Sequence, residues 1–261
     1  MFERPITKKE ASEESEKIET AEYLRPDIKP IMACIGTLAD FKHSHSPHLN
    51  KIEDAINNES RDNSTTNVDY FGSPMELQRQ GFKNRGKHSY VISTIDNKDK
   101  FSHNFINCTG IIVTGKDRET GKNVSFLSHQ DPEHFLREEE DKKQFAADLR
   151  ERTEELKKRC EDGTIDARII GGNYFGEDRW EYDRYQEDYL KSIKLLSSES
   201  SDILGFEPAI VVGPKTVSGK DDVFYDNENR RLYIIRPVVG DASSESFLPQ
   251  NIEEQEKKWL E

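Results

Sequence analysis

A cysteine and a histidine flank a hairpin in the middle of the chain, and these two side chains could carry out chemistry together. The sequence DRETGK has turn-forming residues and separates a strand predicted over 110–115 from one predicted over 123–129. Cys108 lies 10.5 positions before the centre of the turn Asp117–Thr120, and His129 lies 10.5 positions after it. Directly opposed residues of an antiparallel pair have Cβ atoms about 4.5–5.5 Å apart. The spacing therefore predicts that a thiol faces an imidazole, or lies diagonally to it if the loop is one residue longer.

A thiol beside an imidazole is a candidate nucleophile for amide hydrolysis. The imidazole accepts the thiol proton, the thiolate attacks an amide carbon, and the imidazolium protonates the departing amine. Backbone N–H groups near Cys108 are candidate oxyanion donors, because this residue stands where a loop enters a strand. An orienting group for the imidazole could be any of four nearby residues: Ser102, His103, Asn104 and Gln130. We assign four residues to substrate or oxyanion binding: Asn104, Asn107, Thr109 and Gln130.

The elements that must position this pair are strands that alternate with two long helices. Strands are predicted over 87–94, 110–115, 123–129, 164–172 and 207–214, and a closing hairpin is predicted over 222–237. A helix is predicted over 131–162, because Asp131 can cap it, Pro132 suits its first position and Gly163 can end it. A second helix is predicted from apolar residues on one stripe: Tyr182, Tyr185, Tyr189, Ile193 and Leu196.

This order of elements excludes a doubly wound parallel fold, because hairpins recur between the helices. It predicts an α/β fold of the α+β type. In that fold, mixed and largely antiparallel β-sheets form a sandwich-like core that two long helices flank.

The same features resemble the chemotaxis receptor glutamine deamidase (CheD-like) family, whose arrangement the catalytic domains of cytotoxic necrotizing factors share. In this family a cysteine begins a strand, a hairpin follows, and a histidine ends the partner strand. A hydroxyl residue stands six positions before the nucleophile in the chemotaxis branch, as Ser102 stands before Cys108. The segment DARIIGGN also matches the family's strand and Gly-Gly turn.

The resemblance covers about residues 87–237. It implies that Cys108 is the nucleophile, His129 the general base and Ser102 the orienting group. It also implies a partner protein with a reactive glutamine as substrate, and no cofactor. An amine could replace water at the acyl-thioester, so deamidation and transglutamination both stay open.

Composition limits the class of protein. Hydrophobic residues make up 33% of the chain and charged residues 34%, and the net charge is −13. Such a charge disfavours nucleic acids and anionic membranes as general partners. The three cysteines include no CxxC pair, which argues against a disulfide scaffold and a zinc site. We expect no bound metal, and we interpret the histidines of HSHSPH (43–48) as part of a solvated loop.

Neither a signal peptide nor an apolar run of about 20 residues is recognisable. We therefore expect a cytoplasmic protein, or one delivered into a target cell's cytosol without a signal peptide. The predicted organisation is a mobile charged tail over 1–28, an N-terminal extension of uncertain structure over 29–86, a deamidase-like domain over 87–238 and an acidic tail over 239–261.

A second hypothesis from the sequence is a non-catalytic, acidic protein-interaction module on the same fold. The low apolar content and the charge of −13 suit such a module. The bulkier Ile106 and Asn107 also stand where the deamidase family has small residues before its nucleophile. Neither the target protein nor the oligomeric state follows from the sequence under either hypothesis.

Overall fold

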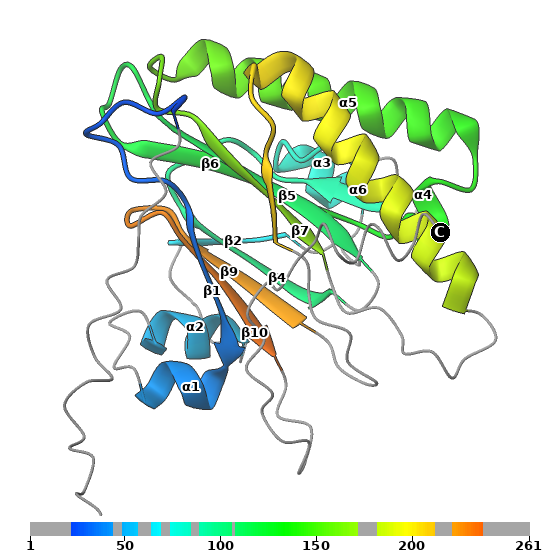
Figure 1. Ribbon diagram of the computed structural model, residues 1–261, viewed down its shortest axis with the longest axis horizontal. Coiled ribbons are helices and arrows are strands. Elements are labelled where there is room, and N and C mark those ends of the chain that lie inside the picture. The colour runs from blue at the N-terminus through cyan, green and yellow to red at the C-terminus, as the bar shows by residue number, and fades with distance from the viewer. Residues whose placement is uncertain are drawn as a thin grey trace, which may run out of the picture.

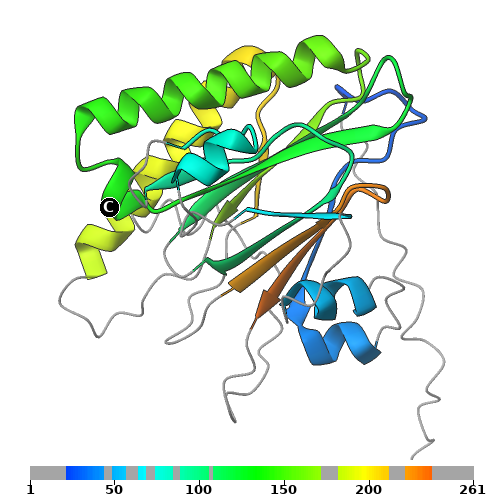
Figure 2. The same ribbon diagram turned by 180° about the vertical axis from the view of Figure 1, so that it is seen from behind.

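The computed structural model describes residues 22–43, 49–56, 64–68, 74–84, 89–105, 108–171, 182–211 and 221–236. Within this part of the chain, two five-stranded mixed sheets pack face to face, with helices outside each of them (Figure 1). The view from behind shows the same four layers (Figure 2). The predicted α+β sandwich with two long flanking helices is confirmed.

The first sheet holds the hairpin that the sequence singles out. Its strand order is β3 (Tyr90–Ile92), β6 (Asn123–Gln130), β5 (Thr109–Lys116), β7 (Asp166–Gly171) and β8 (Ala209–Val211). Only β8 runs parallel to its neighbour, and the other pairs are antiparallel. Because successive side chains alternate between faces, Ile111 and Val113 point toward the helices and Ile112 points toward the second sheet.

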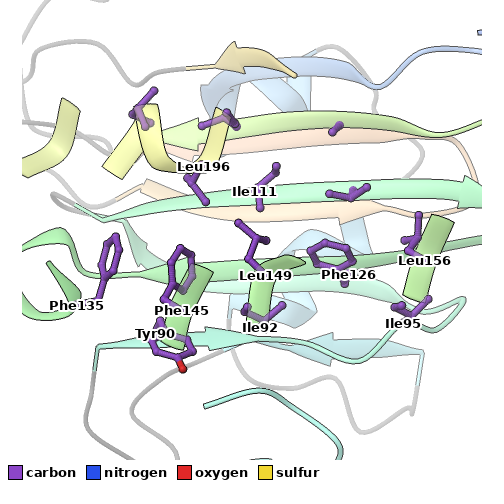
Figure 3. Packing of buried hydrophobic residues seen from close by; sticks show 14 of the residues in the cluster. Tyr90, Ile92, Ile95, Ile111, Phe126, Phe135, Phe145, Leu149, Leu156 and Leu196 are labelled. Atoms are coloured by element: carbon purple, nitrogen blue, oxygen red, sulfur yellow. The ribbon is translucent and has the colours of Figure 1, made fainter. Parts of the chain in front are cut away.

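Two long helices, α5 (Glu139–Arg159) and α6 (Tyr182–Leu204), cover the outer face of the first sheet. Figure 3 shows the cluster they bury, in which Phe145, Leu149 and Leu156 of α5 lie over Ile111 and Phe126 of the sheet. The first turn of α5 is acidic and its last turn is basic, which complements the helix dipole.

The helix predicted over 131–162 is in fact two helices. A short helix, α4 (Pro132–Phe135), begins at the predicted cap, where the Asp131 carboxylate accepts from Glu133 N–H at 3.0 Å. The chain then leaves the helical conformation at Glu138 before α5 starts. The break allows Phe135 and Phe145 to pack together with ring centroids 4.8 Å apart.

The second sheet is built from both halves of the chain. Its strand order is β1 (Met32–Thr37), β10 (Arg231–Arg236), β9 (Asp221–Asp226), β4 (Asp99–Phe105) and β2 (Thr65–Asn67). The pairs β1–β10 and β2–β4 are parallel. The strand β4 was not predicted, and it carries Ser102.

The predicted boundaries near residues 28 and 86 do not separate structural units. Strands β1 and β2 belong to the second sheet, and α1 (Leu38–His43) and α2 (Leu49–Ile56) pack on its outer face. The helix α3 (Pro74–Arg79) adds Leu77 to the cluster between the sheets. Tyr23 stacks on Phe206 with centroids 3.7 Å apart, so residues just after position 21 also contact the core. The predicted acidic tail lies outside the described residues.

Candidate active site

The hairpin places Cys108 and His129 on one face, but not directly opposite each other. The register pairs Lys116 with Asn123 and Thr109 with Gln130. The centre of the turn is therefore one position later than predicted, because Asp117 accepts from the backbone N–H groups of the turn and lengthens it. The position opposite His129 is Gly110, and Cys108 is a diagonal neighbour. Diagonal neighbours have Cα atoms about 7–8 Å apart.

This shared face is the interior of the sandwich. Cys108 is 2% exposed and belongs to the apolar cluster between the two sheets. His129 is 1% exposed and lies on β6, which has β3 on one side and β5 on the other. Both side chains therefore reach substrate only if the sandwich opens beside them.

The second sheet brings two further side chains to the imidazole, and a β-bulge makes this possible. Ser102 pairs with Val223, whereas Phe105 pairs with Asp221, so β4 holds one extra residue between them. Without the bulge, residues three apart would point to opposite faces. Asn104 has a φ of 64°, a left-handed conformation that asparagine tolerates, and its N–H donates to the Asp222 carboxylate at 3.1 Å. The bulge therefore turns both Ser102 and Phe105 inward.

Ser102 determines which ring nitrogen of His129 carries the proton. Its Oγ donates to the backbone carbonyl of Val68 and lies 2.8 Å from His129 Nδ1. Because the single hydroxyl proton is used on the carbonyl, the oxygen accepts from Nδ1–H. The basic lone pair of the ring is then on Nε2, the nitrogen that a general base uses in this tautomer.

Phe105 holds the ring from its flat side. The two rings are stacked, with centroids 4.0 Å apart and planes 13° apart. Phe105 also lies over Gly110, where a Cβ would come within 3.1 Å of the phenyl ring and 2.3 Å of the Ser128 carbonyl. A glycine at this position therefore gives the phenyl ring its place beside His129.

Burial determines the charge of the imidazole. Loss of solvation lowers the pKa of His129 to about 3, although the Val68 carbonyl acts in the opposite direction. At neutral pH the ring is uncharged, so it can accept a proton. Burial in the closed sandwich destabilises an imidazolium, so a proton that the ring accepts must be passed to another group as the reaction proceeds.

Two residues predicted for this site point away from it. The Thr109 and Gln130 side chains lie on the helix side of the first sheet, where Gln130 Nε2 donates to Thr109 Oγ1 at 2.9 Å. Thr109 Oγ1 in turn lies 2.5 Å from Ser192 Oγ of α6. Gln130 therefore does not orient His129. Asn104 acts through the backbone of the bulge, and Asn107 lies outside the described residues.

The other cysteines have different surroundings. Burial raises the pKa of Cys160 to about 12, and this thiol packs under α5. Cys34 is half-buried on β1. In the part of the chain that the structure describes, no three His, Cys, Asp or Glu side chains are placed to hold a metal ion.

The sequence matches no protein-family model and no curated protein. Among the described helices, none is long and apolar enough to cross a membrane.

Sequence reasoning missed Phe105, Val68 and Gly110 as parts of this site. Phe105 lies three positions after Ser102, a spacing that a regular strand places on the other face. The signal for a bulge was the Asn104 between them, because asparagine is enriched in left-handed conformations. Val68 lies in a stretch without strong periodicity, and nothing in the sequence indicated its contact with β4.

Proposed function

We propose that this protein is a thiol-dependent amide hydrolase that deamidates a glutamine side chain on a partner protein. The observation that supports this most is the contact of Ser102 with His129 Nδ1, on the interior face that Cys108 shares. This contact places the basic lone pair on Nε2 and so suits the ring to the general-base role that the CheD-like resemblance implies.

The proposed reaction needs only these groups and water. His129 Nε2 takes the thiol proton while Cys108 Sγ attacks the carbon of the glutamine carboxamide. The C–N bond breaks, the imidazolium gives its proton to the leaving nitrogen, and ammonia departs from an acyl-thioester. Water then attacks the thioester, the imidazole takes its proton, and that proton returns to the sulfur as glutamate leaves.

Substrate access requires a movement that exposes the interior face. The segment 74–84 is the cover that we expect to move. Leu77 and Phe82 of this segment pack in the same cluster as Val91, which pairs with His129. Lys83 exchanges two backbone hydrogen bonds with Ile92 at the edge of the first sheet. This short contact at an edge is easier to open than the central ladder.

The test is the rate of iodoacetamide alkylation of each cysteine against pH, followed by mass spectrometry. Wild type is compared with His129→Gln and Ser102→Ala, and circular dichroism checks that each variant is folded. In wild type, we expect Cys108 to react faster than Cys160. In His129→Gln, we expect Cys108 to react at least tenfold more slowly than it does in wild type. Release of ammonia from a blocked Gln-Gly dipeptide, absent in Cys108→Ser, would show turnover directly.

The second candidate is a non-catalytic protein-interaction module, and the burial of Cys108 favours it. A thiol that is 2% exposed and surrounded by apolar side chains behaves as a small hydrophobic residue. If Cys108 reacts no faster than Cys160 in the folded protein and is insensitive to His129→Gln, the hydrolase proposal is wrong. The interaction module then replaces it.

A further inference from the structure

A second site lies at the other end of the sandwich, where several turns surround a cleft of about 890 Å³. The cleft is formed by the β5–β6 turn, the β9–β10 turn, the loop before β4 and the segment before β1. Figures 1 and 2 both show the β9–β10 turn beside the segment that precedes β1. Thr109, the residue after Cys108, and Lys116 are seven residues apart on β5. At about 3.3 Å per residue, this end of the strand is about 23 Å from Thr109.

The charge of the cleft is opposite to that of the whole chain. Six basic and three acidic side chains line it, a surplus of three positive charges in a protein of net charge −13. Two of the acidic groups are already paired, Asp99 with Lys51 at 3.1 Å and Asp27 with Arg25 at 3.2 Å. Such a local surplus attracts anions from a generally negative surface.

Most of the positive groups have no carboxylate partner among the residues that the structure describes. Within the described ranges, no ion pair involves the ammonium groups of four cleft lysines: Lys29, Lys98, Lys116 and Lys122. The guanidinium of Arg230, which is 4% exposed, donates instead to the Lys29 and Thr164 carbonyls at 3.2 and 2.8 Å. A buried guanidinium and four lysines thus line one cavity, and the described carboxylates leave most of their charge uncompensated.

Asn227 also lines the cleft, and its side-chain amide has an unsatisfied acceptor within the described part of the chain. Its Nδ2 donates to the Asn123 carbonyl at 2.7 Å, and Asn123 Nδ2 donates back to the Asn227 carbonyl at 3.0 Å. This pair of hydrogen bonds fixes the orientation of the Asn227 amide, so Asn227 Oδ1 is the acceptor that remains. The side chain is 2% exposed, and Oδ1 has no hydrogen-bond partner among the described residues. Buried acceptors of this kind are normally satisfied, so a donor on a ligand would complete the site.

We propose that this cleft binds a small phosphate ester that carries hydroxyl groups. The lysines and Arg230 neutralise the phosphate dianion, and a ligand hydroxyl donates to Asn227 Oδ1. The cavity has the size that small-molecule sites usually have. The wider acidic surface disfavours a nucleic acid, which would extend beyond the cleft.

The test is isothermal titration of the full chain at low ionic strength with ribose 5-phosphate, inorganic phosphate, ribose and a poly-glutamate peptide. The variant Lys116→Gln/Lys122→Gln is compared with Lys143→Gln/Lys158→Gln, which removes the same charge from exposed positions on α5. We expect saturable binding of ribose 5-phosphate that is at least tenfold weaker in the cleft variant and unchanged in the control.

Four outcomes would overturn parts of this proposal. Equal affinity in the two variants, or no saturable binding of either phosphate compound, would exclude the anion site. Inorganic phosphate binding as tightly as ribose 5-phosphate would exclude hydroxyl recognition by Asn227. Preferential binding of a poly-glutamate peptide would replace the small molecule with an acidic protein partner. None of these outcomes depends on Cys108.

Discussion

Ser102 and His129 meet in an apolar layer where most neighbours are aliphatic or aromatic. Polar groups in such a layer cost about 1–3 kcal/mol each when they lack partners. Here the Val68 carbonyl, the Ser102 hydroxyl and His129 Nδ1 form one chain of hydrogen bonds across the two sheets. The chain keeps a titratable ring in place without a charged partner, which is how the interior can hold a base.

The buried imidazole should make stability depend on pH in acid. The pKa of His129 is lowered from 6.5 to about 3 in the folded state, so between these values the unfolded chain binds the extra proton. Stability from this group is therefore complete above pH 6.5 and falls as the pH drops, by up to about 1.4 kcal/mol per unit. Urea unfolding at pH 7.5, 5.5 and 4.5 measures this slope.

His129→Gln provides the comparison for that slope, because it removes the titration and leaves every carboxylate unchanged. The difference in unfolding free energy between wild type and variant should stay level above pH 6.5 and shrink below it. A difference that stays constant over this range would mean that His129 is not buried as a neutral ring.

Removing the Ser102 hydroxyl should also destabilise the fold. Ser102→Ala leaves the Val68 carbonyl without its donor and the Nδ1–H without its acceptor, at an expected cost of about 1–3 kcal/mol. Ser198→Ala is the control, since this exposed hydroxyl bonds only within α6. Equal unfolding free energies for the two variants would show that Ser102 makes no buried contact of importance.

The bulge in β4 is the element that assembles the site from two sheets. It depends on the left-handed backbone of Asn104, which costs about 1–2 kcal/mol for most residues with a Cβ. We expect Asn104→Gly to keep or raise the free energy of unfolding. Asn104→Val should lower it by about that amount and loosen the contact of Phe105 with His129. Urea denaturation of the two variants distinguishes them, and equal stabilities would exclude a strained bulge.

The cap of α4 is a second element whose contribution can be measured. The Asp131 carboxylate accepts from the Glu133 N–H and lies 3.0 Å from His134 Nδ1. Asp131→Ala should lower the unfolding free energy by about 0.5–2 kcal/mol. Asp162→Ala removes an exposed carboxylate with an ion pair to Arg118 and should cost much less. Thermal melts of both variants measure this difference. Equal shifts of the melting temperature in Asp131→Ala and Asp162→Ala would contradict the prediction.

Elements with a clear pattern were predicted well, and those without one were missed. The strands β5 and β6 contain short apolar runs on either side of the turn sequence DRETGK, and Asp131 with Pro132 marks a helix start. The strand β4 has the sequence DKFSHNF, in which Lys100 and Ser102 face the interior and so break the expected pattern of polar outward residues. Lys100 pairs with Asp96, four residues earlier in the chain, and Ser102 contacts His129 of the other sheet. The contact with His129 cannot be read from local sequence.

The candidate site was predicted in part. Cys108 and His129 do share one face of the hairpin, as the count of residues indicated, but the turn is one position longer than assumed. The contact of Ser102 with the ring agrees with what the resemblance implied. Gln130 and Thr109 were assigned to the site without regard to the alternation of side chains between the two faces of a strand. This alternation places both side chains on the helix side of the sheet, under α6. The catalytic roles of Cys108, His129 and Ser102 stay predictions until reactivity is measured.

The whole molecule should not tolerate removal of its first third. A chain that begins at residue 87 lacks β1, β2 and both helices on the second sheet, which exposes Phe224 and Tyr233. We expect this chain to lose the cooperative thermal unfolding of the full protein. A chain that begins at residue 22 keeps every described contact and should unfold as the full chain does. A cooperative transition for the shorter chain would show that residues 87–238 are an independent domain.

The pairing of β1 with β10 has a consequence for synthesis. Thr37 and Arg236 are register partners at the end of one parallel pair, 199 positions apart in the chain. At about 5–20 residues per second, a ribosome needs roughly 10–40 s to make the chain between them. During that time the apolar MACIG of β1 has no partner strand, so the nascent chain is a candidate client for chaperones that bind short apolar segments. The second sheet can close only after almost the whole protein has been translated.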